Sequence, residues 1–103
     1  MADIRMVVES PLRQGVDEEV AYQLTTTNWG GTPSSVSVKV FDITAGGTDV
    51  TSTVMPTNSP SVNADVITLS KLKLLTVGKL YRVEIKFTSG GNIFEAFCDV
   101  YGE

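Results

Sequence analysis

Two segments near the end of the chain alternate between apolar and polar residues, and a pair of glycines separates them. The first segment runs from Leu80 to Thr88 and the second from Ile93 to Tyr101. Alternation with a period of two residues is typical of strands with one buried face, and paired glycines favour a tight turn between such strands. The pattern therefore predicts a β-hairpin with Gly90 and Gly91 at its turn.

The position of the turn also determines which residues of the hairpin face each other. One face is then entirely apolar, whereas the other carries two pairs of opposite charge, as expected for a sheet with one buried face. A shift of one residue would mix the two faces. The apolar pairs are Phe87 with Phe94, Ile85 with Ala96, Val83 with Cys98, and Tyr81 with Val100; the other face pairs Lys86 with Glu95, Glu84 with Phe97, and Arg82 with Asp99.

Earlier parts of the chain show strand signals in shorter segments. Strands are predicted at residues 4–9, 18–25, 35–41 and 50–55. Residues 62–69 could hold one strand or two, and we favour a strand at 65–69 with Ile67 and Leu69 facing inward. Connections rich in turn residues are predicted at 11–17, 26–34 and 56–60.

Short strands at close spacing, with no convincing helix, predict an all-β sandwich or barrel. The leucine-rich segment 71–76 is too short to form a helix without tertiary contacts. The chain has 103 residues, of which 42% are hydrophobic and 19% are charged. This size and composition suit one globular domain spanning residues 1–103.

The charge of the chain argues against a nucleic-acid partner. Eight Lys and Arg residues against twelve Asp and Glu residues give a net charge of −4, and the basic residues are scattered apart from Lys71, Lys73 and Lys79. A nucleic-acid backbone requires clustered basic side chains. The first residues form no apolar signal segment, and no apolar run is long enough to span a membrane. We therefore expect synthesis in the cytoplasm and no membrane partner.

Residue types that commonly carry catalysis are scarce in this chain. It has no histidine, which removes the usual general base and the commonest ligand for transition metals. Cys98 is the one cysteine and faces the core in the predicted hairpin, so we expect a structural thiol. The adjacent acidic residues 17–19 alternate faces in an extended chain and do not converge on a cation. We expect no enzyme activity, no cofactor and no metal site.

The residues that lead into the hairpin resemble a known structural motif. Leu75, Gly78 and Tyr81 stand in the order Leu-x-x-Gly-x-x-Tyr. This order resembles the tyrosine corner of immunoglobulin-like and fibronectin type III-like sandwiches, in which the tyrosine hydroxyl bonds back to the backbone of the corner. The resemblance implies an antiparallel β-sandwich of this type with about seven strands, in which these three residues are structural.

A second resemblance runs from about Val36 to the C-terminus. Short Thr- and Val-rich strands, a Pro-rich loop and the hairpin are together similar to small immunoglobulin-like proteins encoded among phage and prophage structural genes. The chain lacks the cysteine pair of antibody-type domains, and Trp29 lies in a Gly-rich loop and not in a central strand. The resemblance implies a non-enzymatic component of a phage head, tail or connector, located in the virion.

Trp29 is the most conspicuous side chain in a predicted loop, and it allows two interpretations. A large ring at the end of a sandwich suits a binding site, for example for a glycan. The same ring could instead fold back over the core as a lid. The first interpretation would make the chain a ligand- or glycan-recognition module, which is the alternative to a structural role.

Ile93, Phe97 and Tyr101 lie on the outward face of the second hairpin strand by the predicted pairing. An excess of apolar residues on such a face indicates that something covers it. Two covers fit: another protein, either a second copy or a different virion protein, and the N-terminal strand or a loop of the same chain. The sequence therefore predicts a module that acts through protein–protein contacts, with these three residues and Trp29 as candidate interaction residues.

Overall fold

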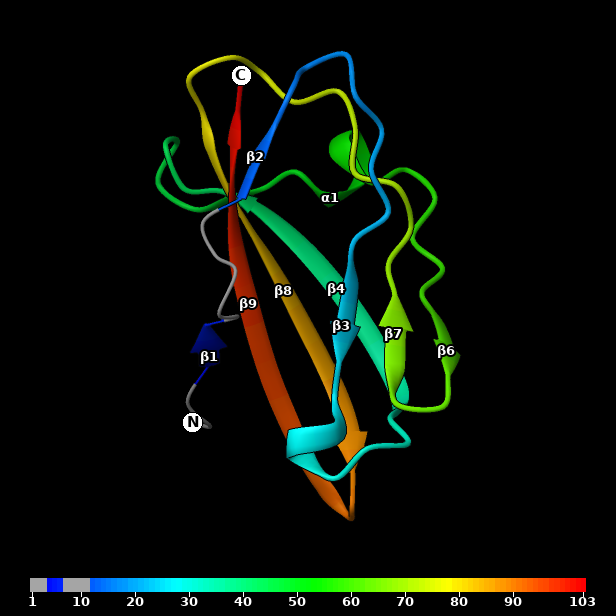
Figure 1. Cartoon of the computed structure of the whole chain (residues 1–103). Helices are drawn as coiled ribbons and strands as arrows, with labels where there is room; N and C mark the ends of the chain where they lie inside the picture. Colours follow the sequence, from blue (N-terminus) through cyan, green and yellow to red (C-terminus); the bar gives the residue numbers. More distant parts are fainter. Residues whose placement is uncertain (1–3, 7–11) are drawn as a thin grey trace.

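The computed structural model describes residues 4–6 and 12–103, and most of its regular structure is β-strand in two facing sheets (Figure 1). The larger sheet has the order β1-β9-β8-β4-β5, with β2 also paired to β9, and the smaller sheet has the order β3-β7-β6. The predicted all-β fold is therefore confirmed. The strands are β1 (Ile4–Met6), β2 (Leu12–Gln14), β3 (Gln23–Thr25), β4 (Ser34–Asp42), β5 (Thr48–Asp49), β6 (Ser61–Asn63), β7 (Val66–Thr68), β8 (Leu80–Ser89) and β9 (Asn92–Gly102), and two short helices are η1 (Thr27–Trp29) and α1 (Thr51–Val54).

The hairpin of β8 and β9 forms the centre of the larger sheet, and its pairing is the one predicted. Gly90 and Gly91 form the turn with φ angles of +58° and +80°. Glycine adopts this left-handed backbone without a steric penalty. The pairing runs without interruption from Ser89 opposite Asn92 to the far end of both strands. The sequence pattern alone therefore predicted the register of the two longest strands.

Two short strands from the N-terminal part of the chain lie along the edge of β9. Both β1 and β2 run parallel to β9, in contrast to the antiparallel pairs elsewhere in the two sheets. The strand predicted at 4–9 is confirmed at residues 4–6, and its remaining residues 7–9 lie outside the described part of the chain. The connection predicted at 11–17 is wrong at Leu12–Gln14, which form β2.

Strand β2 lacks an apolar signal because its most buried residue is polar. Gln14 is 1% exposed, and all of its side-chain polar atoms have partners. Its Nε2 donates to the backbone oxygens of Leu72 at 2.7 Å and Glu18 at 3.0 Å, and its Oε1 accepts a hydrogen bond from the Tyr22 hydroxyl at 2.8 Å. A buried amide with satisfied hydrogen bonds is compatible with the core. Gln14 thereby ties this edge strand to the neighbouring loops.

The strand predicted at 35–41 is confirmed as β4, whereas the one predicted at 18–25 is confirmed only in part. Its last three residues form β3, and Val20 makes an isolated bridge with Leu72. The Gln14 amide bonds the backbone oxygens of residues 18 and 72 at this point. A side chain therefore takes the place of a continuing strand ladder.

Residues 50–55 form a helical turn and not the predicted strand. Thr51 ends the strand region, because its hydroxyl donates to the Asp49 carboxylate at 2.7 Å and accepts from the Val40 N–H at 2.8 Å. Val54, which is 2% exposed, then points into the core from α1. Burial of this apolar side chain outweighs the low helix propensity of Thr and Val.

The strand favoured at 65–69 is confirmed at Val66–Thr68 as β7, and β6 at Ser61–Asn63 is a second strand that the favoured arrangement did not include. Ile67 and Leu69 are buried, as predicted. The space between the sheets is filled by one apolar cluster, to which both sheets contribute. It comprises Leu24, Val38, Val40, Val54, Met55, Ile67, Leu69, Leu72, Leu75, Tyr81, Val83, Ile85, Phe87, Ala96, Cys98 and Val100.

Tyr81 lies at the start of β8 with its ring in the core and its hydroxyl at the preceding loop. The ring is 3% exposed, and the Thr76 N–H donates to the hydroxyl at 2.9 Å. Leu75 is buried, and the Gly78 N–H donates to the backbone oxygen of Gly102 at 3.0 Å. The bond from the tyrosine to the backbone of the preceding loop, which the corner motif requires, is therefore present.

We expect Tyr81→Phe to lower the free energy of unfolding by about 1 kcal/mol. The substitution keeps the buried ring and removes only the acceptor of the Thr76 N–H. Equilibrium unfolding in urea, compared between the two proteins, measures the difference. An unchanged midpoint would mean that water replaces the hydroxyl and that this bond adds no stability.

The carboxylate of Asp65, in the turn between β6 and β7, holds the loop that leads into β4. It accepts hydrogen bonds from the Thr32 N–H at 3.0 Å and the Thr27 hydroxyl at 2.9 Å. The Asp65 backbone oxygen also accepts from the Thr26 N–H at 2.8 Å. Hydrogen bonds to the charged form, first that from Thr32, lower the pKa of the Asp65 carboxyl. This loop is therefore held partly by a charge that acid removes.

We expect the stabilising effect of the Asp65 charge to disappear in acid. Because its pKa in the folded chain is below the ordinary value of 3.8, the contribution is full above that value and is lost as the pH falls through the lower, folded pKa. Asp65→Asn imitates the protonated form. In urea unfolding across a pH series, the wild-type chain should be more stable than this variant at neutral pH, and the difference should shrink below about pH 4.

Two further carboxylates, Asp42 and Asp49, also stabilise the fold less as the pH falls. Their loss is the same in the wild-type chain and in Asp65→Asn, so the difference between these two proteins reports on Asp65 alone. The pKa of Asp42 is lowered chiefly by the hydrogen bond from Lys79, and that of Asp49 by the hydrogen bond from the Thr51 hydroxyl. The free energy of unfolding of the two proteins could instead differ by the same amount in acid as at neutral pH. That result would show that the amide of the Asp65→Asn variant fits poorly and that the loss of charge is not the cause.

Candidate interaction surface on the larger sheet

The larger sheet turns one face toward the smaller sheet and its other face, called here the outer face, away from it (Figure 1). Alternation along each strand sends every second side chain to this outer face. Except for Asp99, which is buried, these side chains are exposed or half-buried. The outer face comprises Ser37, Lys39 and Phe41 of β4, Leu80, Arg82, Glu84, Lys86 and Thr88 of β8, and Ile93, Glu95, Phe97, Asp99 and Tyr101 of β9.

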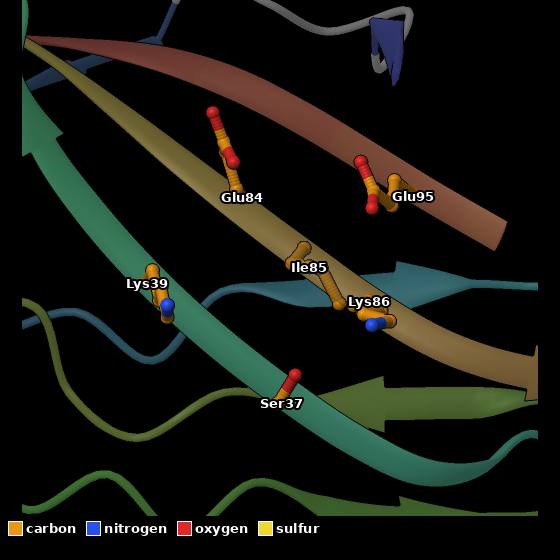
Figure 2. Close-up of a pocket in the computed structure, with 6 residues that line it drawn as sticks. All are labelled: Ser37, Lys39, Glu84, Ile85, Lys86 and Glu95. Carbon is orange, nitrogen blue, oxygen red and sulfur yellow. The ribbon is translucent and has the colours of Figure 1, made fainter. Parts of the chain in front are cut away.

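Strand pairing arranges the middle of the outer face in rows that cross the three strands. One row is Ser37, Lys86 and Glu95, and the next is Lys39, Glu84 and Phe97. A shallow depression of about 200 Å³ lies at these rows and is lined by Ser37, Lys39, Glu84, Ile85, Lys86 and Glu95. In Figure 2 the carboxylates of Glu84 and Glu95 lie on the side of β9, and the amino group of Lys39 lies over β4.

The four charged side chains of the depression form no ion pair within the described residues. The ion pairs of the described residues lie elsewhere and join Arg13 to Glu103, Lys79 to Asp42, and Arg82 to Asp99. The depression thus presents two ammonium groups and two carboxylates to its surroundings, over a floor to which Ile85 contributes. Such a surface can accept the charged side chains of another protein.

Arginines shield two of the apolar residues predicted on β9. The Arg82 guanidinium carbon lies 4.2 Å from the centre of the Phe97 ring, while the Arg82 Nε donates to the Asp99 carboxylate at 3.0 Å. Arg13 of β2 lies 5.2 Å from the centre of the Tyr101 ring. Both are cation–π contacts, which are modest in energy at exposed sites. The N-terminal part of the chain therefore contacts Tyr101 through Arg13 but leaves this residue 36% exposed, so it does not form the full cover that one interpretation predicts.

Ile93 is the most exposed of the predicted interaction residues. Its side chain is 61% exposed beside the hairpin turn, and Tyr101 at the other end of β9 is 36% exposed. The structure therefore places Ile93, Phe97 and Tyr101 in one column along β9, with charged residues between them, and does not gather them into a single apolar patch.

Trp29 packs onto the core at the hairpin end of the molecule. It belongs to η1 and is half-buried. Its ring stacks on Phe87 at a centroid distance of 5.4 Å and on Phe94 at 6.4 Å. This is the arrangement that the lid interpretation predicts, and it leaves only part of the ring available to a ligand.

The remaining candidate residues occupy structural positions. Cys98 is 5% exposed in the core, as expected. In the acidic segment 17–19, the Glu18 carboxylate accepts a hydrogen bond from the Gly15 N–H at 2.6 Å. In the described part of the chain, no group of three or more His, Cys, Asp or Glu residues could hold a metal ion. No helix there has the length and apolar character needed to cross a membrane.

The sequence alone predicts the position of only some residues of the depression. The Lys86–Glu95 pair follows from the hairpin register, and the alternation in β4 correctly turns Ser37 and Lys39 outward. The row neighbours across β4 and β8, such as Lys39 and Glu84, depend on pairing between strands about 45 residues apart. No short-range signal specifies that pairing.

Comparisons of the chain with protein-family models, with curated proteins and with solved structures found no match.

Proposed function

We propose that the two sheets form an immunoglobulin-like sandwich. The order of the strands supports this assignment: β9-β8-β4-β5 facing β3-β7-β6 matches strands G-F-C-C′ facing B-E-D in that fold. The position of Tyr81 also agrees, because the tyrosine corner of the fold lies near the start of strand F, which is β8 here. The longest hairpin then corresponds to strands F and G.

On this fold we propose a non-enzymatic interaction module that assembles with other proteins in a phage or prophage virion. The outer face of the larger sheet is the observation that carries the proposal. It combines exposed apolar residues, Ile93 at 61% and Tyr101 at 36%, with ammonium and carboxylate groups that have no ion-pair partner within the described residues. Apolar anchors within a charged surround are typical of protein interfaces. The virion assignment follows from the resemblance of the sequence to phage accessory proteins.

Amine-directed cross-linking tests this proposal in lysates and particles from cells that carry the gene. Lys39 and Lys86 lie on the outer face, whereas Lys71 is exposed in the loop before β8 and serves as the internal control. We expect links to other protein chains to concentrate on Lys39 and Lys86 and to be enriched in assembled particles. Links that involve Lys71 alone, or no links in particles, would contradict the proposal.

A further inference from the structure

The charges of the depression are arranged so that the outer face is complementary to itself. Glu84 and Lys86 are two residues apart on β8 and point to the same side, at a separation of about 6.6 Å along the strand. Ile85 lies between them on the strand and is also one of the residues that line the depression. Consider a two-fold axis that lies in the face and crosses β8 at Ile85, perpendicular to the strand. Rotation about this axis exchanges the positions of Glu84 and Lys86.

We propose that a second copy of this chain docks on the outer face about this axis. The inference rests on the proposed function, since it names the partner of the same surface. Glu84 of each copy then lies opposite Lys86 of the other, which gives two equivalent ion pairs. Sheets that pack face to face are about 10 Å apart, a gap that Glu and Lys side chains can bridge from both sides.

The neighbouring strands fit the same axis. Glu95 is in the row of Lys86 and Phe97 is in the row of Glu84, so Glu95 lies opposite Phe97 of the second copy. The Arg82 guanidinium over that ring, 4.2 Å from its centre, is an attractive partner for the Glu95 carboxylate. On β4 the exchange of rows brings Lys39 opposite the hydroxyl of Ser37. Each of these charged groups thus meets a complementary partner.

The charges also exclude the other simple arrangement. A two-fold axis that runs along β8 would leave each residue in its own row and place Lys86 opposite Lys86 and Glu84 opposite Glu84. Like charges in direct opposition are strongly unfavourable in an interface. The pattern on β8 therefore selects the perpendicular axis.

The size of the face predicts a weak dimer. Three strands at about 4.8 Å spacing and ten residues at about 3.3 Å give roughly 500 Å² per copy, or about 1,000 Å² in total, at the lower end for specific interfaces. Much of this area is charged, so salt should weaken the contact. We expect a reversible, salt-sensitive association that appears at high protein concentration.

Sedimentation velocity over a concentration series at low and high salt tests the dimer with single charge reversals. Glu84→Lys gives a chain with lysine at both positions, and Lys86→Glu gives one with glutamate at both. Each variant alone should dimerise at least about tenfold more weakly than the wild type, because like charges then face each other. Lys73→Glu is the matched control for Lys86→Glu, because it makes the same change in net charge away from the face, and it should dimerise like the wild type.

Two rescue measurements make the test specific. An equimolar mixture of the two single variants should form a heterodimer, because one chain now presents only lysine and the other only glutamate at the two positions. The double variant with both changes should recover self-association, since the swap restores complementarity. Circular dichroism and urea unfolding check that all variants fold.

The outcomes separate this inference from the proposed function. A wild-type chain that stays monomeric at all concentrations, or a dimer that the single reversals leave intact, overturns the self-docking inference. Cross-links from Lys39 and Lys86 to a different protein would leave the proposed function standing in either case. Loss of dimerisation in both single variants with recovery in their mixture would establish the contact.

Discussion

Replacing Phe87 with alanine is expected to lower the free energy of unfolding by about 3–5 kcal/mol, a large part of the stability of a domain of this size. Phe87 is fully buried, with 0% of its surface exposed. Its ring lies 5.4 Å from that of Trp29 and 5.8 Å from that of Phe94, measured between centroids. Truncation leaves a cavity at the point where η1 meets the hairpin, and it removes the surface on which Trp29 stacks.

The chain contains one tryptophan, so its fluorescence reports on this site. Urea unfolding followed by Trp29 emission should show a lower midpoint for Phe87→Ala and a red-shifted emission in the folded state, because the ring becomes more accessible to water. Ile93→Ala is the matched control on the same hairpin: its side chain is 61% exposed, and the expected change is within about 0.5 kcal/mol. Equal midpoints for both variants would show that the aromatic cluster does not anchor this end of the fold.

The hairpin could be predicted in full because all the information for it is local. The glycine pair specifies the turn, and the two faces then differ so clearly in polarity that only one register fits. The same reasoning failed at β2, where burial depends on the hydrogen bonds of the Gln14 amide to Tyr22 and to Leu72, which is 58 residues further along the chain. A polar residue in a short segment gives no apolar period that would reveal a strand.

The error at residues 50–55 has a related cause. Thr and Val favour strands, but Thr51 bonds to the Asp49 carboxylate and to the backbone of Val40, and these contacts end the strand after β5. The helical turn then carries Val54 into the core. Tertiary contacts that no local pattern records therefore override the intrinsic preference of the segment.

The candidate surface shows the same division between local and non-local information. The outward positions on β8 and β9 follow from the hairpin, so the charged pairs and the column of Ile93, Phe97 and Tyr101 were predicted as outward. The contacts that modify this column come from elsewhere. Arg13 reaches Tyr101 from β2, a strand that the sequence did not reveal. The apolar surface is consequently less open than the alternation of β9 alone implies.

At the opposite end of the molecule from Trp29, we expect Gly102→Ala to lower the free energy of unfolding by about 1–3 kcal/mol. A Cβ at this position would lie 2.3 Å from the backbone oxygen of Thr76, so either strand β9 or the loop must move. The loop is not free to yield, because the Gly78 N–H donates to the Gly102 oxygen and the Gly102 N–H donates to the Lys79 oxygen, both at 3.0 Å. Thr76 also donates its own N–H to the Tyr81 hydroxyl.

Gly15→Ala is the control for Gly102→Ala, because the three atoms nearest to its added Cβ belong to the side chain of Glu18 and not to the backbone. Moving that side chain costs only its exposed hydrogen bond from the Gly15 N–H. Urea unfolding should show little change for the control and a clear loss for Gly102→Ala. Combining Gly102→Ala with Tyr81→Phe should cost less than the sum of the two single changes, since both act through the position of Thr76. Additive losses would mean that the end of β9 and the tyrosine contact stabilise the loop independently. A smaller combined loss would show that β9, the loop before β8 and Tyr81 form one cooperative unit, which holds the last strand of the outer face in register.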